Sequence, residues 1–215
     1  MTTTLYHFGR SSASHRVRWA LAHKGIEYKS VFVDLFAGEQ HSADYRARNP
    51  MGHVPALEID GHLLAESVAI LEYLEETRPT PPLYPATPIA RARVRQVVEL
   101  IASGVQPLQN LTVLAKVSSD PAAQRAWGVF FNERALRACE ALLLQIDAEL
   151  GAGRFAVGAE LSAADLFLVA QLGAARRFGM ALDDFPRLVA AEAAALATPH
   201  AAGAAPEAQQ APPVR

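Results

Sequence analysis

The fold is decided by one stretch near the beginning of the chain, Thr4–Trp19, with the sequence TLYHFGRSSASHRVRW. Its first half, Leu5–Phe8, is apolar and predicts a short β-strand. Hydroxyl side chains follow at Ser11, Ser12 and Ser14, where helical periodicity begins. The first N–H groups of a helix lack intrahelical partners and the helix dipole is positive there, so this turn predicts an anion site. A hydroxyl beside that dipole can also stabilise a bound thiolate.

The helix after this turn should be short and amphipathic. It is predicted from Ser14 to Lys24, and Gly25 is the residue type that commonly ends a helix. We expect its buried face to consist of Val17, Ala20 and Leu21. The cationic side chains are expected to point away from that face, namely Arg16, Arg18 and Lys24.

Strand and helix signals continue to alternate as far as Glu76. Strands are predicted over Tyr28–Val33, Pro55–Ile59 and His62–Ala65, and the last two flank Asp60-Gly61, a strong hairpin-turn signal. A helix follows over Ser67–Glu76. The resulting order, β-α-β-(α)-β-β-α, predicts a mixed sheet with helices.

A proline-rich segment, Arg78–Pro82, interrupts this pattern and predicts a linker. Strand signals are absent after it. Four alanine- and leucine-rich segments are predicted to be helical: Pro88–Val117, Pro121–Leu150, Ser162–Phe178 and Pro186–Leu196. We therefore expect a first domain at residues 1–78, a linker at 79–86 and an all-helical domain at 87–215.

Two local patterns refine the helical part. Ser162, followed three residues later by Asp165, is close to the capping-box pattern that begins a helix. This structural role accounts for both residues, so we assign Asp165 no catalytic role. The tail from Pro199 is rich in Ala, Pro, Gly and Gln, and we expect it to fray from about residue 199.

Composition excludes several classes of function. The net charge of −2 is unlike the basic excess of a nucleic-acid-binding protein, and 51% hydrophobic with 20% charged residues is ordinary for a globular protein. The chain has one cysteine, Cys139, no long apolar run and no signal-peptide pattern, so we expect a cytoplasmic protein without a membrane partner. The seven histidines show no metal-ligand spacing, and we expect no metal.

Several motifs resemble those of the zeta class of glutathione transferases. The segment RSSASHRVR, residues 10–18, is similar to the zeta active-site motif, Ser-Ser-Cys-Ser followed by an Arg-Val-Arg helix. The segment QPLQNL, residues 106–111, is similar to a second zeta motif. Asn49–Leu57, with its Val-Pro pair, and Glu66–Glu76 resemble glutathione transferases in general. These matches span roughly residues 4 to 190.

The resemblance implies a particular fold and cofactor. The fold would combine an α/β thioredoxin-like N-terminal domain with an all-α C-terminal domain, and the protein would form a homodimer. The cofactor would be glutathione. The implied binding residues are Ser11, Ser12, Ala13, Ser14, Gln40, Val54, Glu66, Ser67, Gln106, Asn110, Leu111 and Thr112.

The resemblance also implies individual roles in glutathione binding. Ser11 would stabilise the thiolate, although Ser12 or Ser14 could exchange roles with it, since any of the three could cap the helix. Val54, before a cis proline, would pair its backbone with the cysteinyl part of glutathione. Glu66 and Ser67 would hold the γ-glutamyl end.

The implied activity is glutathione-dependent cis–trans isomerisation, most simply of maleylacetoacetate to fumarylacetoacetate in the catabolism of tyrosine or another aromatic acid. The substrate is a dianion, and Arg10 and Arg177 match arginines that could each bind one carboxylate. The catalytic set implied is therefore Ser11, Ser12, Arg10 and Arg177. Ala13 stands where the family usually has cysteine, so chemistry that needs a protein thiol is not expected.

Three alternatives remain open from the sequence. The same thiolate could attack α-haloacids or other electrophiles and consume glutathione. The substrate could be maleylpyruvate, although this chain lacks the arginine that related maleylpyruvate isomerases carry near Leu111 and Thr112. The protein could also bind glutathione without turnover.

Overall fold

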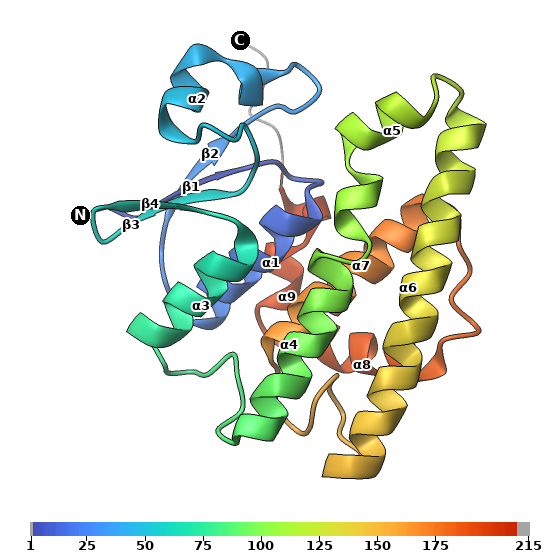
Figure 1. The fold of residues 1–215 in the computed structure, drawn as a ribbon. Helices are drawn as coiled ribbons and strands as arrows, with labels where there is room; N and C mark the ends of the chain where they lie inside the picture. Colours follow the sequence, from blue (N-terminus) through green and yellow to red (C-terminus); the bar gives the residue numbers. More distant parts are fainter. Residues whose placement is uncertain (1, 210–215) are drawn as a thin grey trace. The chain divides into compact units, whose positions relative to one another are not determined.

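The protein is described by a computed structural model that covers residues 2–209 (Figure 1). The chain divides into two compact units. The first contains the residues up to Leu83 together with those from Pro199, and the second is Tyr84–Thr198. Within residues 2–209, no helix is both long enough and apolar enough to cross a membrane.

The first unit is built on a four-stranded mixed sheet with the order β2-β1-β3-β4. The strands are β1 (Thr4–His7), β2 (Lys29–Phe32), β3 (Ala56–Ile59) and β4 (His62–Ala65). β1 runs parallel to β2 and antiparallel to β3, which is antiparallel to β4. The hairpin turn at Asp60-Gly61 has φ of 53° and 85°, as a tight turn between two strands requires. The predicted strands and turn are confirmed.

Helices cover both faces of this sheet. They are α1 (Ser12–His23), α2 (Ala43–Arg48), α3 (Ser67–Thr77) and α9 (Ala201–Ala204), with short 3₁₀ turns η1 (Glu39–His41) and η3 (Pro206–Ala208). Figure 1 shows α1 and α3 on one face of the sheet and α2 on the other. On the α2 side, Tyr6, Val33, Tyr45 and Ala56 form a buried cluster. The predicted thioredoxin-like order of elements is confirmed.

Helix α1 is buried on more sides than its periodicity predicts. Arg16, Arg18 and Lys24 are 4%, 1% and 9% exposed, so the prediction that they point away from the buried face is wrong. The helix packs against both α3 and α9, which leaves little of its surface in water. Each buried cation then needs hydrogen-bond acceptors inside the unit, because a buried charge without partners is costly.

Lys24 meets this requirement with three acceptors. Its Nζ donates to Glu75 Oε2 at 3.0 Å, to Arg78 O at 2.7 Å and to Pro81 O at 2.9 Å. The same Glu75 oxygen accepts from Leu83 N at 2.9 Å. The segment after α3 is therefore bound to the first unit as far as Leu83, and the boundary between the two units, Leu83/Tyr84, falls within the predicted linker at 79–86.

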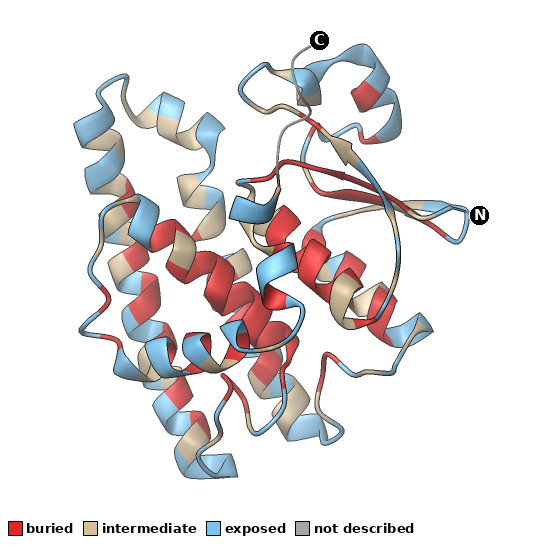
Figure 2. Ribbon diagram, turned by 180° about the vertical axis from the view of Figure 1, so that it is seen from behind, coloured by how far each residue is buried: buried red, intermediate tan, exposed pale blue. Residues whose placement is uncertain are grey.

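The second unit is all-helical, as predicted. Its elements are α4 (Pro88–Ala102), η2 (Gln106–Gln109), α5 (Leu111–Val117), α6 (Pro121–Leu150), α7 (Ala163–Arg177) and α8 (Pro186–Leu196). Helix α7 is buried along most of its length and packs against α4 and α8 (Figure 2). Its start has the predicted capping interaction, since Ser162 N donates to Asp165 Oδ2 at 2.9 Å.

The helical segment predicted over Pro88–Val117 is divided in the structure into α4, η2 and α5. α4 ends before Gly104, where an added Cβ would lie 2.4 Å from Leu100 O. Pro107 cannot donate a helical hydrogen bond, and the side chain of Asn110 starts α5 by accepting from Val113 N at 2.9 Å.

The prediction that the chain frays from about residue 199 is also corrected. Ala201–Ala204 form α9, and Ala201 and Ala204 are only 1% and 2% exposed because they pack against α1. The segment belongs to the first unit, not to the helical domain that precedes it in sequence. Small side chains favour this close docking of backbone on helix. The part of the predicted fraying that falls on residues 210–215 lies outside the described residues.

The Lys24–Glu75 pair gives a test of this packing. We expect Lys24→Met to lower the free energy of unfolding by about 3–5 kcal/mol, because it leaves a buried carboxylate without its cation. Urea denaturation would measure this. The double variant Lys24→Met/Glu75→Gln should lose less than the sum of the single variants. A loss below about 1 kcal/mol for Lys24→Met would contradict the buried-pair description.

Candidate functional site

The first part of the site is the N-terminus of α1. Ser11 is the N-cap, with φ −69° and ψ 120°, and its Oγ accepts from Ser14 N at 3.1 Å. Ser11 N in turn donates to Phe8 O at 3.1 Å. Ser12 and Ala13 follow as the first two helical residues and are half-buried. The strand, turn and helix predicted from the sequence therefore meet at Ser11.

This geometry decides which serine caps the helix. The bond from Ser14 N occupies a lone pair of Ser11 Oγ and leaves the hydroxyl proton of Ser11 able to donate to an anion. Ser14 is 0% exposed and its Oγ lies 3.5 Å from Phe8 N. Ser14 is therefore buried within the unit, and its role in glutathione binding stays a prediction.

The backbone N–H and C=O of Val54 form the second part of the site. The Val54–Pro55 peptide is cis, as the resemblance implied, and Val54 lies just before β3. Among residues 2–209, neither the N–H nor the C=O of Val54 has a hydrogen-bond partner. Both groups can therefore pair with the backbone of an extended peptide.

The N-terminus of α3 is the third part. Glu66 precedes the helix with φ 64°, is exposed, and has its Oε1 3.9 Å from His53 Nδ1. Ser67 is the first helical residue and is 4% exposed. Its Oγ accepts from Arg16 Nε at 2.8 Å, so α1 supports the start of α3 directly.

Arg16 is a further candidate for the site, which the sequence-based prediction does not include. Burial lowers the pKa of its guanidinium to about 9, while the nearby charge of Glu66 acts in the opposite direction. The group therefore remains cationic at neutral pH and adds positive charge beneath the N-terminus of α3. The Arg-Val-Arg motif was the available signal, but helical periodicity assigned Arg16 to the outside.

His7, the last residue of β1, is a buried histidine whose protonation state is set by its surroundings. Its Nδ1 lies 3.3 Å from Arg18 Nη1 and its Nε2 lies 2.7 Å from Ser30 Oγ. Burial and the Arg18 charge lower the pKa of His7 to about 4. The imidazole is therefore neutral at pH 7, with Nδ1 accepting from Arg18 and Nε2 donating to Ser30.

Two further candidates of the first unit lie at its surface. Gln40 is in η1, where its Nε2 donates to Leu35 O at 3.4 Å, and its buried Oε1 has no partner among the described residues. Arg10 is exposed, with its guanidinium carbon 5.9 Å from the centre of the Phe36 ring. Phe36 is itself 66% exposed, so this stacked pair is open to solvent.

Candidates of the second unit divide into half-buried and exposed groups. Gln106 is half-buried and belongs to an amide network that joins η2 to α6 and α7, since Gln106 and Gln109 donate to Gln171 Oε1 at 3.3 and 3.1 Å. Asn132 donates to Gln109 Oε1 at 2.7 Å and completes the network. Gln106 thus has a structural role that the sequence did not indicate.

The remaining candidates lie at helix ends. Asn110 is the N-cap of α5 and is exposed, as are Leu111 and Thr112. Arg177 is the last residue of α7 and is exposed, which suits a side chain that binds an anion. Its neighbour Arg176 pairs with Glu192 through both terminal nitrogens, which accounts for that charge.

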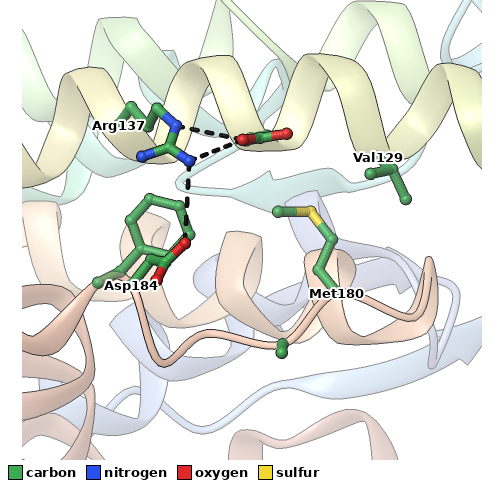
Figure 3. A pocket seen from close by; sticks show the side chains of 7 residues that line it. Val129, Arg137, Met180 and Asp184 are labelled. Atoms are coloured by element: carbon green, nitrogen blue, oxygen red, sulfur yellow. Dashed lines mark hydrogen bonds and ion pairs between the residues drawn. The ribbon is translucent and has the colours of Figure 1, made fainter.

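A cavity of about 230 Å³ lies elsewhere in the second unit (Figure 3). It is lined by Val129, Arg137, Met180 and Asp184, among others, and none of the predicted site residues lines it. Arg137 is held by Glu133 Oε1 at 2.8 Å and lies 3.8 Å from Asp184 Oδ2. Its charge is thus already balanced, and the cavity is smaller than typical ligand pockets. Within residues 2–209, no group of three or more His, Cys, Asp or Glu residues could hold a metal ion.

Comparison with known proteins agrees with this description. Residues 1–76 match the glutathione S-transferase N-terminal domain. Maleylacetoacetate isomerase of Rattus norvegicus is 47% identical over 86% of this chain and 83% of its own. The crystal structure of maleylacetoacetate isomerase from Anaeromyxobacter dehalogenans with bound GSH has a TM-score of 0.86 and 45% identity, over 97% of this chain and 96% of that one. A bacterial zeta-class maleyl pyruvate isomerase has a TM-score of 0.91 and 37% identity, over 96% and 98%.

The thioredoxin-like sheet, the serine-capped helix and the all-helical second unit together define a glutathione transferase fold. Within that class, the chain belongs to the zeta family that contains the maleylacetoacetate isomerases.

The neutral state of His7 makes stability depend on pH. Because the pKa of His7 is lowered on folding, the unfolded chain binds more protons below pH 6.5, and stability falls as the pH drops from 6.5 toward 4. We expect His7 to contribute about 2 kcal/mol to the loss between pH 7 and pH 5. Urea denaturation of wild type and His7→Gln at both pH values would measure it. Equal losses in the two proteins would contradict a neutral His7.

Proposed function

We propose that this protein is a glutathione-dependent cis–trans isomerase that converts maleylacetoacetate to fumarylacetoacetate, a step in the breakdown of tyrosine or another aromatic acid. The observation that carries the proposal is Ser11, whose oxygen caps α1 while its proton remains able to donate. The zeta-family relationship supports the choice of reaction, because relatives across most of the chain are named maleylacetoacetate isomerase.

Glutathione fits the polar groups of the first unit. Its thiol would lie at Ser11, with Ser12 and Ala13 in the same helical turn. Its cysteinyl backbone would pair with Val54, whose N–H and C=O are unpaired among the described residues. Its γ-glutamyl carboxylate would bind Ser67 and the α3 N-terminus over the Arg16 charge, and Glu66 would take the ammonium group. Gln40 would be a further contact, because its Oε1 has no partner among the described residues and can accept a hydrogen bond from glutathione.

The N-terminus of α1 can supply the energy that thiol activation needs. A thiol with a pKa near 8.5 is only about 3% ionised at pH 7. Lowering the pKa by about two units requires about 2.7 kcal/mol of preferential stabilisation of the thiolate. One hydrogen bond to a charged group contributes about 1.5–3 kcal/mol, and a helix N-terminus adds about 0.3–2 kcal/mol. Ser11 on α1 combines the two.

When bound, glutathione supplies a thiolate that adds reversibly to the cis double bond, which permits rotation before the thiolate leaves. The protein's part is to hold charge. Arg10 and Arg177 are both exposed, and each would bind one carboxylate of the dianionic substrate. Asn110, as the cap of α5, with Leu111 and Thr112 beside it, would orient the substrate, while Gln106 supports their position through the amide network. Cationic groups near the developing enolate stabilise the transition state.

Maleylpyruvate is the alternative substrate, because a zeta-class neighbour at 37% identity is a maleyl pyruvate isomerase. Both substrates present two carboxylates on a cis double bond, so the same residues serve either. We further propose that the protein forms a homodimer and that it acts in the cytoplasm. Equilibrium sedimentation would test the dimer.

The central test is Ser11→Ala. We expect kcat for maleylacetoacetate isomerisation to fall about 10- to 100-fold at pH 7, because the bound thiol loses its hydrogen-bond donor. Substrate loss with and without glutathione would be followed in purified protein, together with the glutathione concentration.

Ser11→Gly is the matched control, because glycine at the N-cap costs the helix only a few tenths of a kcal/mol and carries neither a hydroxyl nor any other side-chain donor. It should be as slow as Ser11→Ala, whereas Ser11→Thr should retain most of the activity. Stoichiometric consumption of glutathione would instead identify a conjugating transferase. Tight glutathione binding without turnover of either substrate would identify a binding protein.

Arg16 gives a separate test of glutathione binding. We expect Arg16→Met and Ser67→Ala each to weaken binding about 10-fold, and the double variant to bind no more weakly than the single variants, because both act on one carboxylate. Isothermal titration calorimetry would measure this. A glutathione analogue without the γ-glutamyl carboxylate should bind all four proteins equally. Arg46→Met, on the exposed surface of α2, is the control.

A further inference from the structure

The described C-terminal segment, Ala201–Gln209, packs beside the turn that carries Ser11. Two of its residues, Ala201 and Ala204, are buried against α1, while Ala202 between them is exposed. The segment also folds back on itself, since Gln209 Nε2 donates to Gly203 O at 2.8 Å. It is therefore a small ordered part of the first unit.

Arg18 connects this segment to the turn before Ser11. Its side chain is 1% exposed, and its Nε donates to Ala204 O at 2.9 Å. The other end of the same guanidinium donates to Gly9 O at 3.1 Å and to Phe8 O at 3.4 Å. One rigid, planar group thus joins the C-terminal segment to two successive carbonyls of the turn.

The carbonyl of Phe8 is also the acceptor of Ser11 N, at 3.1 Å. Among the described residues, Gly9 and Arg10 make no sheet or helix hydrogen bonds, so on the strand side of Ser11 the turn is held by these bonds to Phe8 and Gly9. On the helix side, Ser11 accepts from Ser14 N at 3.1 Å and from His15 N at 2.9 Å. Gly9 is in close contact with the segment as well, because a Cβ at Gly9 would lie 3.1 Å from Gln209 O and 3.2 Å from Gln209 Cβ.

We propose that Arg18 is a positioning residue for Ser11, and that the segment Ala201–Gln209 holds Arg18 and the turn in the conformation that activates the thiol. This inference rests on the proposed function, in which Ser11 stabilises the thiolate of glutathione. Neither Arg18 nor the segment touches glutathione in this scheme. They act through the carbonyls of Phe8 and Gly9.

The physical reason is that a hydrogen bond to a thiolate depends steeply on geometry. A functional group must be held within about 0.5 Å of its working position by side chains that are themselves fixed. If Ala204 O moves away, the buried Nε of Arg18 has no acceptor there, and the guanidinium turns to find another. The carbonyls of Phe8 and Gly9 then lose the hydrogen bonds from Arg18, and the turn that carries Ser11 gains freedom to move.

The test uses the full-length chain with Ala201→Glu, which places a charged side chain at the buried contact and displaces the segment from α1. Ala202→Glu is the matched control, because Ala202 is exposed on the same helix. Three quantities would be measured: hydrogen exchange of the residue 8–14 amides without glutathione, the thiol pKa of bound glutathione from its thiolate absorbance, and the glutathione dissociation constant.

We expect Ala201→Glu to increase exchange of the Ser11 amide and to raise the thiol pKa of bound glutathione by about one unit, from about 6.5 to about 7.5, which lowers the thiolate population and kcat about threefold at pH 7. The glutathione dissociation constant should change less than about threefold, because the γ-glutamyl contacts are separate. Ala202→Glu should behave as the wild type. Arg18→Met should reproduce the effects of Ala201→Glu from the other side of the contact.

A cycle with Ser11→Ala separates positioning from general destabilisation. In the Ser11→Ala background, Ala201→Glu should leave the thiol pKa and kcat within about twofold of the Ser11→Ala values. Unchanged exchange and thiol pKa in Ala201→Glu and Arg18→Met, or equal effects with and without Ser11, would overturn the inference. A wild type that ionises bound glutathione but isomerises neither substrate would overturn the proposed function alone.

Discussion

The structure of the first unit depends on one constraint: helix α1 buries three cationic side chains, and each must find acceptors within the unit. Arg16 donates to Ser67 at the start of α3, Arg18 to the turn before Ser11 and to α9, and Lys24 to Glu75 and the segment after α3. Because an unsatisfied buried charge costs several kcal/mol, these bonds restrict where the surrounding elements can lie.

This constraint links packing to the proposed chemistry. The two helix N-termini that would receive the thiolate and the γ-glutamyl carboxylate are those of α1 and α3, and α1 carries the arginines that support both. The cations thus raise the positive potential at the site and hold its donors in place with the same bonds. Substituting one of them should therefore change both stability and ligand binding, whereas exposed arginines such as Arg46 should change neither much.

Local signals in the sequence predicted most of the secondary structure correctly. Gly25 ends α1 with φ 65°, Asp60-Gly61 forms the hairpin, and Ser162 with Asp165 starts α7. Each involves residues at most three or four apart, so their chemistry can be read along the chain. The wrong predictions concern interactions between residues that are far apart in the sequence. Arg16, Arg18, Gln106 and α9 each have at least one partner more than fifty positions away.

The sequence by itself determined the order of strands and helices, the serine-capped helix N-terminus and, through its motifs, the glutathione transferase family. Only the tertiary structure decided that Ser11 is the cap, that Ser14 is buried, that Arg16 supports Ser67 and that the C-terminal segment returns to the first unit. The reason is that burial of a long polar side chain depends on where its acceptors lie. Those acceptors are backbone carbonyls and hydroxyls brought together by folding, which no periodicity along the chain encodes.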